Sequence, residues 1–136
     1  MDKLTKEQRS KNMKAVKNKD SKIELLLRKA LRQRGFGYRK NYRALEGTPD
    51  IVLTKYKIAI FCDSEFWHGF DWEHKKLEIK SNREFWYTKI EGNIARDKFV
   101  TETLSKQGWT VVRFWGGEIL KNPDLCAEKI RDLCTR

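Results

Sequence analysis

Two aspartates, Asp50 and Asp63, are the residues whose types and positions most directly suggest chemistry. Asp50 stands immediately before the apolar segment Ile51–Leu53, and Asp63 immediately after the apolar segment Ile58–Cys62. If the two segments pair as a β-hairpin, an acid at the start of one strand meets an acid at the end of the next. Converging carboxylates form an oxygen-rich site of the kind that Mg²⁺ prefers. A Mg²⁺ ion held there would suit phosphodiester hydrolysis.

The pattern around these acids predicts the elements that position them. Ser21 and Glu24 occupy the first and last positions of a capping box, which predicts a helix start, and Gly35 is a suitable stop. The helix carries one apolar stripe at helical spacing, formed by Ile23, Leu26, Leu27, Ala30 and Leu31.

Apolar runs of strand length and a second helical stretch complete the pattern. We expect strands at Phe36–Tyr42, Ile51–Leu53, Ile58–Cys62 and Trp109–Phe114. We expect a loop over 63–82, a helix over 82–106 that ends at Gly108, and a final helix with Asn122 as N-cap and Pro123 as its first residue. The fold class is therefore α/β, a single domain with a mixed central sheet flanked by helices in the order α-β-β-β-α-β-α.

The core of the long helix is predicted from its spacing. Adjacent residues cannot share one helical face, so we expect Phe85 to be buried and its neighbour Trp86 to be exposed. The candidate core positions are Phe85, Ile90, Ile94, Phe99 and Leu104.

The charge distribution favours a polyanionic partner. The chain of 136 residues has a formal net charge of +11. Residues 1–45 hold 15 lysines and arginines against 4 acids, whereas the remainder is balanced. This asymmetry favours nucleic acid over a basic face that serves only solubility. Residues 1–20 are expected to form a basic arm that contacts nucleic acid, within one domain over 1–136.

Composition also excludes several classes of protein. No apolar run approaches the length of a membrane span, and the first residues contain no apolar signal segment. The three cysteines have neither disulfide-framework nor zinc-site spacing. We therefore expect a cytoplasmic protein.

The strand and acid pattern resembles the PD-(D/E)xK nuclease core, although Asp63-Ser64-Glu65 lacks the lysine of that motif. Over nearly its whole length the chain more closely resembles the very-short-patch-repair (Vsr) DNA mismatch endonucleases, a variant of that restriction-endonuclease-like fold. The segments that carry this resemblance are Arg9–Met13, Ser21–Glu24, Gly47–Asp50, Phe66–His68, Glu84–Trp86 and Asn93–Asp97.

The resemblance implies a Mg²⁺-dependent enzyme, using one or two ions, that nicks one DNA strand beside a T·G mismatch. Such mismatches arise when 5-methylcytosine deaminates. It implies that Asp50 is a direct metal ligand and that Cys62 offers its backbone carbonyl. Glu24 and His68 match residues that orient metal-bound water or the attacking group, and Asp97 matches an acid of the same site.

The resemblance also implies DNA contacts. Phe66, Trp67 and Trp86 match aromatic residues that wedge into the base stack, where an apolar side chain offsets the cost of unstacking. In the basic arm, the corresponding contacts are Lys11, Asn12, Met13 and Lys14.

Two departures from the family change these expectations. Asp63 stands where the family usually has a second histidine, so we expect Asp63 to bind metal directly and His68 to be the only histidine of the site. The identity of the general base then stays open. Members of the family carry a structural zinc, but the matching positions here are Glu65, Phe70, Trp72 and Gly117. We expect no zinc, with Phe70 and Trp72 filling the space by apolar packing.

Plainer explanations exist for single residues. Glu24 could serve only its capping box, and Asp97 could pair with Arg96 or Lys98 on a helix surface. Three functions therefore stay open: mismatch nicking, restriction-type or homing-type cleavage of an ordinary duplex, and DNA binding by a catalytically decayed module.

The expected partner is double-stranded DNA with a T·G mismatch. Mismatch-repair proteins and a cytosine-C5 methyltransferase belong to the pathway that the resemblance implies. The resemblance also implies a bacterial protein that associates with the nucleoid when bound to DNA. We expect no membrane association, and we expect a monomer, because one mismatch offers no two-fold axis to match.

Overall fold

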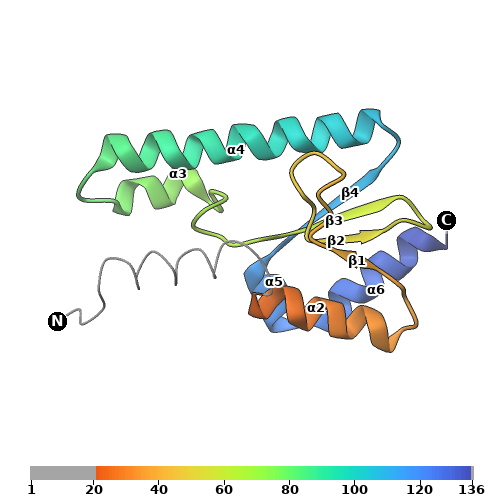
Figure 1. The fold of residues 1–136 in the computed structure, drawn as a ribbon. Helices are drawn as coiled ribbons and strands as arrows, with labels where there is room; N and C mark the ends of the chain where they lie inside the picture. The colour runs from red at the N-terminus through yellow and green to blue at the C-terminus, as the bar shows by residue number, and fades with distance from the viewer. Residues whose placement is uncertain (1–20, 136) are drawn as a thin grey trace, which may run out of the picture.

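The computed structural model describes residues 21–135, which form a mixed four-stranded sheet with helices on both faces (Figure 1). The strand order is β1-β2-β3-β4. The pairs β1–β2 and β2–β3 are antiparallel, whereas β3 and β4 are parallel. Their bounds are Arg39–Lys40, Ile51–Leu53, Ile58–Asp63 and Thr110–Trp115. The predicted mixed α/β class is confirmed.

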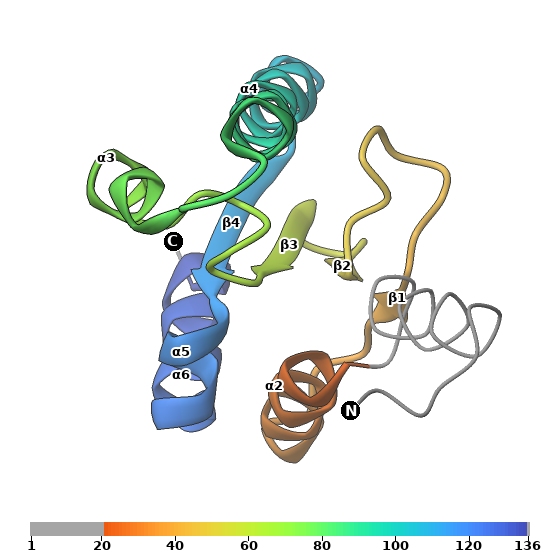
Figure 2. The same cartoon turned by 90° about the vertical axis from the view of Figure 1, so that its left-hand side faces the viewer.

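Three helices cover one face of the sheet: α2 (Lys22–Gln33), α5 (Gly116–Lys121) and α6 (Pro123–Cys134) (Figure 2). They meet the sheet in a hydrophobic core to which both central strands contribute alternate residues. That core comprises Leu27, Ala30, Leu31, Ile51, Leu53, Ile58, Ile60, Phe114, Ile119, Cys126, Ala127 and Ile130.

The long helix α4 (Arg83–Lys106) covers the opposite face. Because side chains alternate along a strand, Ala59 and Phe61 of β3 point to this side, where they pack with Val100 and Leu104 of α4. Asp63 lies two residues beyond Phe61 and shares its face. The alternation therefore directs this acid toward α4.

The predicted helix boundaries agree with the capping observed. The Ser21 hydroxyl accepts a hydrogen bond from the Glu24 amide (3.4 Å), and the Asn122 side chain accepts one from the Leu125 amide (3.0 Å). Gly35 follows α2 at a φ of +82°, which a residue without a Cβ adopts freely. These caps fix where α2 and α6 begin and where α2 ends.

The expected loop over 63–82 is wrong in part. It contains α3 (Trp72–Lys75) and the 3-10 helix η1 (Lys76–Glu78). Trp72 is buried against Tyr87 of α4, with ring centroids 5.6 Å apart, and its indole N–H donates to Glu91 (2.9 Å). The short helix thus packs along the first half of α4, which extends past the sheet in Figure 1.

Two predicted core positions of α4 are wrong: Phe85 lies on that extension, and Phe99 lies next to the buried Val100 but faces away from the sheet. Phe85 and Phe99 are each 59% exposed, and Trp86, expected to be the exposed neighbour, is half-buried. The first turns of α4 have no sheet beneath them, so an aromatic residue there has no core to enter. Ile90 and Leu104 are buried as predicted.

Two other boundaries also differ from expectation. The strand predicted over Phe36–Tyr42 is only two residues long, and both residues of β1 are exposed. The glycine pair after β4, expected only as a strand break, begins α5, because Gly116 and Gly117 are its first residues.

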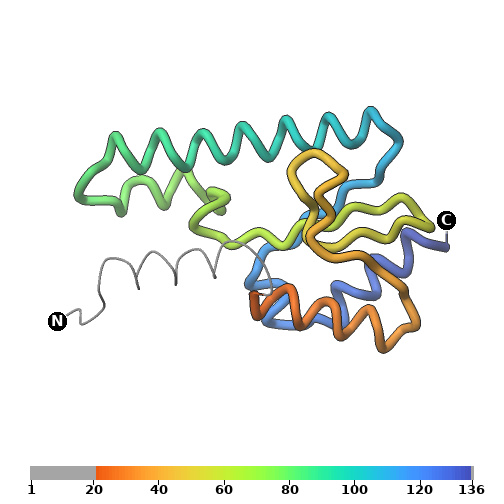
Figure 3. The backbone as a smooth tube through the Cα atoms, in the orientation of Figure 1, coloured from red at the N-terminus to blue at the C-terminus, as the bar shows by residue number. Residues whose placement is uncertain are grey.

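The segment between β1 and β2 folds up against α4 (Figure 3). Gly47, at a φ of +76°, lies so close to Val100 that a Cβ would approach the valine side chain to 2.6 Å. A glycine is required here both by the backbone conformation and by this contact. The close approach brings Asp50, three residues later, to the side of the sheet that α4 covers.

Candidate active site

One cleft of about 820 Å³ gathers side chains from five separate parts of the fold. Its acids come from α2, from the residue before β2, from the end of β3 and from α4, and its histidine comes from the loop after β3. All five residues predicted to be catalytic line it: Glu24, Asp50, Asp63, His68 and Asp97. The sheet and its two helical layers thus bring together residues that are up to 73 positions apart in the sequence.

The sequence pattern predicted that Asp50 and Asp63 converge across the β2–β3 hairpin, but the residue that Asp50 contacts is Cys62, while the Asp63 carboxylate is bound by Arg113. The Cys62 main-chain N–H donates a hydrogen bond to Oδ2 of Asp50 over 2.7 Å. Burial raises the pKa of Asp50 from 3.8 to about 7, with further contributions from the charges of Glu24 and Asp63 and opposed by the Cys62 hydrogen bond. Burial and the same acids also raise the pKa of the Cys62 thiol, so this side chain stays protonated.

Glu24 takes part both in the N-terminal cap of α2 and in the lining of the cleft. Its backbone N–H completes half of the capping box, while its buried carboxylate forms a 2.8 Å ion pair with Arg28 one turn later. The acid therefore faces the cleft with its charge partly balanced by a residue of its own helix.

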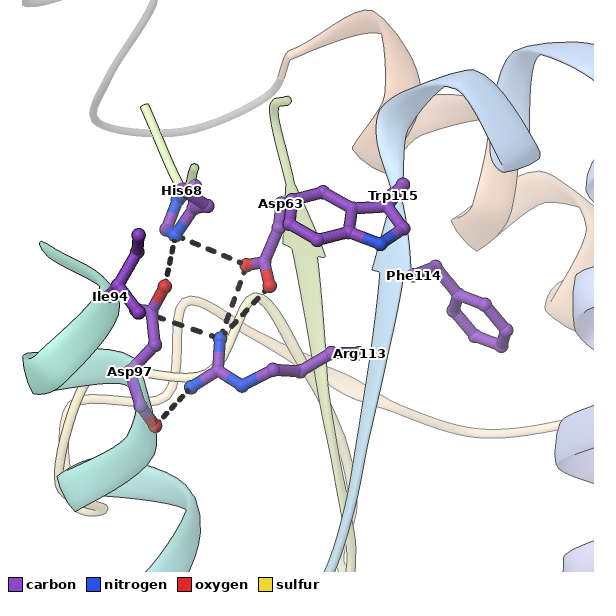
Figure 4. A pocket seen from close by; sticks show the side chains of 7 residues that line it. All are labelled: Asp63, His68, Ile94, Asp97, Arg113, Phe114 and Trp115. Carbon is purple, nitrogen blue, oxygen red and sulfur yellow. Dashed lines mark hydrogen bonds and ion pairs between the residues drawn. The ribbon is translucent and has the colours of Figure 1, made fainter. Parts of the chain in front are cut away.

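His68 and Asp97 form a closely coupled pair. Nδ1 of His68 lies 2.6 Å from Oδ2 of Asp97 and 3.7 Å from Oδ1 of Asp63 (Figure 4). A carboxylate only accepts hydrogen bonds, so Nδ1–H donates to Asp97. Burial lowers the pKa of the imidazole, but the hydrogen bond to Asp97 and the two negative charges outweigh it and raise the pKa above the usual value. Asp97 pairs with His68 rather than with its helix neighbours Arg96 and Lys98.

Arg113 of β4 is a member of the site that sequence reasoning missed. Its Nη1 donates to both carboxylate oxygens of Asp63, at 3.2 and 3.1 Å, and its Nη2 donates to the main-chain carbonyl of Asp97 at 3.2 Å. The signal was an arginine in the otherwise apolar strand Val111–Trp115.

Two groups of side chains have the chemistry to hold a metal ion. On one side of the cleft, the Asp50 carboxylate lies against the backbone of Cys62, whose carbonyl would be a second oxygen donor. On the other side, ligand atoms of Asp63, His68 and Asp97 lie within 4.8 Å of one another, although Arg113 already occupies both oxygens of Asp63. The hard oxygen donors at Asp50 and Cys62 suit Mg²⁺ better than a set that includes imidazole.

An aromatic cluster lies beside the cleft. The rings of Phe66, Trp67 and Trp86 are mutually in contact, with centroids 5.4 to 5.9 Å apart, and Phe66 is half-exposed. Phe85 packs edge-on against Trp86 at 5.0 Å. The structure therefore groups the three aromatic residues for which the family resemblance implies contact with the base stack, and it adds Phe85, which was expected in the core.

The four positions that match zinc ligands in the resembling family make other contacts here. Oε2 of Glu65 accepts a 2.7 Å hydrogen bond from the Gly117 amide. Phe70 packs edge-on against Trp115 with ring centroids 5.0 Å apart, and Trp72 packs against α4 as described above. The contacts of Glu65 and Phe70 fasten the loop that carries Phe66, Trp67 and His68 to the junction of β4 and α5, and Trp72 fastens the same segment to α4.

Basic side chains line the same cleft on two sides. Arg43 belongs to the β1–β2 segment, and Lys89 and Arg96 belong to α4. Lys89 also lies over the Trp67 ring at 5.8 Å. The predicted arm contacts Lys11, Asn12, Met13 and Lys14 lie outside the residues that the structure describes. Within residues 21–135, no helix is both long enough and apolar enough to span a membrane.

Comparisons with known proteins agree with this geometry. A family model described as DNA mismatch endonuclease Vsr matches residues 1–74. The type II nicking enzyme V.HpaIIP of Haemophilus parainfluenzae is 58% identical over 125 residues, covering 91% of this chain and 89% of that protein. The type II nicking enzyme V.NmeDIP of Neisseria meningitidis is 54% identical over 131 residues, covering 96% and 88%. The DNA mismatch endonuclease Vsr of Escherichia coli is 36% identical over 107 residues, covering 79% and 68%.

Proposed function

Because this chain belongs to the Vsr family of DNA endonucleases, we propose that it nicks one strand of a DNA duplex beside a T·G mismatch in a Mg²⁺-dependent reaction. The observation that carries the proposal is the position of the aromatic cluster of Phe66, Trp67 and Trp86 beside the cleft that contains Asp50, His68 and Asp97. Base-stack opening and phosphodiester hydrolysis then take place at adjoining surfaces.

The electrostatics of Asp50 fit a divalent cation. Its carboxylate is desolvated and faces two other acids, Glu24 and Asp63, so that a proton is retained to about pH 7. A cation bound here would stabilise the ionised form of the Asp50 carboxylate, which burial and the two neighbouring acids disfavour. Asp50 and the Cys62 carbonyl would hold it, and Asp63 would join them only by turning away from Arg113.

When bound, Mg²⁺ would neutralise charge that develops on the scissile phosphate. The proton chemistry belongs to the protein. With Nδ1–H donated to Asp97, the His68 ring keeps Nε2 as an acceptor, and this nitrogen takes the proton of the attacking water. His68 therefore acts as general base, with Asp97 fixing its tautomer.

Selectivity for a mismatch follows from the cost of opening the stack. Unstacking costs a few kcal/mol per step, and the cost is smallest where pairing is already imperfect. Side chains of Phe66, Trp67 and Trp86 would fill the opened step. Arg43, Lys89 and Arg96 would contact the phosphates on either side of it.

The substrate places the reaction in repair of deaminated 5-methylcytosine in the bacterial cytoplasm. We infer that a cytosine-C5 methyltransferase creates the sites and that mismatch-repair proteins act in the same pathway. A monomer suffices, because one mismatch has no two-fold symmetry.

The test compares duplexes that differ only in T·G or T·A, in several flanking contexts, with each strand labelled in turn. Wild type and Asp50→Asn are assayed with Mg²⁺ or with EDTA, and Asp71→Asn serves as a control acid outside the cleft. We expect a nick in one strand of the T·G duplex, with Mg²⁺, for wild type and Asp71→Asn only.

Other outcomes would assign the protein differently. Equal cutting of both duplexes would indicate a restriction-type or homing-type nuclease. Salt-sensitive binding without cutting in any context would indicate a decayed DNA-binding module.

A further inference from the structure

Arg113 uses every part of its guanidinium within the site (Figure 4). Nη1 donates to Asp63, Nη2 donates to the carbonyl of Asp97, and Nε donates to the Thr101 hydroxyl at 2.9 Å. The planar group also stacks over the Phe61 ring, 4.1 Å from its centroid. One side chain of β4 is thereby fixed to β3 and to α4 at once.

The pairing with Asp63 is required by burial. Asp63 is only 5% exposed, and a buried carboxylate without a cation is strongly destabilising. Phe61 lies directly opposite Arg113 in the parallel register of β3 and β4. The strand pairing therefore places the guanidinium beside the one acid at the end of β3.

Arg113 also controls the surroundings of His68. The imidazole Nδ1 faces two carboxylates, at 2.6 Å from Asp97 and 3.7 Å from Asp63. Arg113 contacts the residues that bear both of them: it binds the carboxylate of Asp63 directly and the backbone of Asp97, whose Oδ1 lies 3.8 Å from Nη1. Both acids that flank the imidazole thus contact the same arginine.

We propose that Arg113 is a positioning residue for the nicking reaction, holding Asp63 and Asp97 so that the His68 ring presents Nε2 to the cleft. Asp63 then acts as the anchor of this arrangement, not as a metal ligand or a base. This inference rests on the proposed function, because it assigns the arginine to the same site.

A purely structural role makes a different prediction. If Arg113 served only to join α4 to the sheet, its loss would lower stability without a specific effect on His68. Arg34 offers a matched control, because it joins α2 to α6 through ion pairs with Asp124 and Glu128 at 3.1 and 3.3 Å, away from the cleft.

The experiment compares Arg113→Gln, Arg113→Lys, Asp63→Asn and Arg34→Gln with wild type. For each variant, the single-turnover nicking rate on T·G duplex, the affinity for that duplex in EDTA and the melting temperature are measured separately. Misplacing a catalytic group by about 1 Å costs about 100-fold in rate. We expect a loss of that order in Arg113→Gln with DNA affinity unchanged, partial recovery in Arg113→Lys, and no loss of rate in Arg34→Gln.

A double variant separates positioning from folding. Arg113→Gln with Asp63→Asn removes both charges of the buried pair, so it avoids the uncompensated carboxylate of the single change. Because both residues act through His68, we expect the double variant to be no slower than the slower single variant. Multiplicative losses would overturn the proposal.

A spectroscopic readout is independent of nicking. The chain has two histidines, so a His74→Gln background leaves His68 as the only one. We expect the ring N–H proton of His68, sheltered by Asp97, to give a resolved NMR signal in wild type and Arg34→Gln that is lost in Arg113→Gln. An unchanged signal would overturn the proposal. If wild type nicks no duplex, the proposed function fails, while this signal still decides whether Arg113 positions the ring.

Discussion

The main-chain N–H of Cys62 donates a hydrogen bond to Oδ2 of Asp50 across the β2–β3 hairpin, over 2.7 Å. Among the described residues, this is the only hydrogen bond that the Asp50 carboxylate accepts, so Oδ1 is left for another partner. One N–H does not offset the cost of burial and of two neighbouring acids, and the pKa rises to about 7.

Asp50→Asn should therefore stabilise the metal-free protein above neutral pH. The folded-state pKa of about 7 lies above the reference value of 3.8. As pH rises between these values, the unfolded chain loses its proton first, so the free energy of unfolding falls. Asparagine accepts the same hydrogen bond without a charge. In EDTA at pH 8 we expect the variant to melt several degrees above wild type, a gain on the order of a few kcal/mol, and to lose that advantage at pH 4. Equal melting temperatures at pH 8 would contradict this.

Mg²⁺ should stabilise the folded protein through the same carboxylate. A ligand at about 100 times its dissociation constant adds about 2.7 kcal/mol to the free energy of unfolding. We expect the melting temperature of wild type at pH 8 to rise with Mg²⁺ concentration, and that of Asp50→Asn to stay constant. Asp71→Asn, which alters an exposed acid paired with His74, should respond as wild type does.

The pH dependence of nicking should report the His68–Asp97 pair. The hydrogen bond to Asp97 and the charges of Asp63 and Asp97 raise the pKa of His68 against the effects of burial and Arg113. A base must be neutral to accept a proton, so the rate should rise with pH around a midpoint above 6.5. Asp97→Asn removes one of these charges, and we expect a slower enzyme whose midpoint lies at lower pH. His74→Gln should leave the profile unchanged; a shift there would show that another histidine is measured.

Trp86→Ala should weaken recognition of the mismatch while the fold is kept. Stacking of an aromatic side chain on a base contributes about 1–3 kcal/mol, so nicking of the T·G duplex should fall by roughly 10- to 100-fold. Phe99→Ala is the matched control, because Phe99 is an exposed aromatic residue on the same helix outside the cluster. Fluorescence of 2-aminopurine next to the mismatch should increase on binding of wild type and of Phe99→Ala, but not of Trp86→Ala. The same increase in all three would exclude Trp86 from the opened stack.

Gly117→Ala should destabilise the attachment of the loop that carries His68. A Cβ at Gly117 would lie 2.7 Å from Oε2 of Glu65. The Glu65 carboxylate would then have to move, and it would lose the hydrogen bond that the Gly117 amide donates to it. Gly92→Ala is the opposite case, since Gly92 lies inside α4 with nothing within 4 Å of an added Cβ. We expect a lower melting temperature for Gly117→Ala. For Gly92→Ala we expect the free energy of unfolding to increase by about 1 kcal/mol. Glu65→Gln should reproduce part of the loss.

The predictable parts of this fold are those with a local cause. The caps at Ser21 and Asn122 lie next to the helices that they begin, and the apolar run before Asp63 marks a buried strand by itself. The antiparallel pairing of the strands that follow Asp50 and precede Asp63 was also predictable, because adjacent strands commonly form a hairpin.

The predictions that failed concern residues whose burial or contacts are decided by packing against other helices and strands. Spacing alone assigned Phe85 and Phe99 to a core, but it could not show that the first turns of α4 extend beyond the sheet or that Phe99 faces away from it. Trp72–Lys75 is too short for a helical period to be visible. Arg113 joined the site through the parallel register of β3 with β4, a pairing between segments about 50 residues apart.

The extension of α4 beyond the sheet determines which residues of that helix can change without loss of stability. Residues 83–86 contribute to neither hydrophobic core, whereas Asp97 and Leu104, farther along the same helix, face the cleft and the interior. Substitutions at the exposed residues 83–85 should therefore cost the fold little free energy. Under the proposed function, they would change the surface beside the opened base stack without disturbing the acids of the cleft.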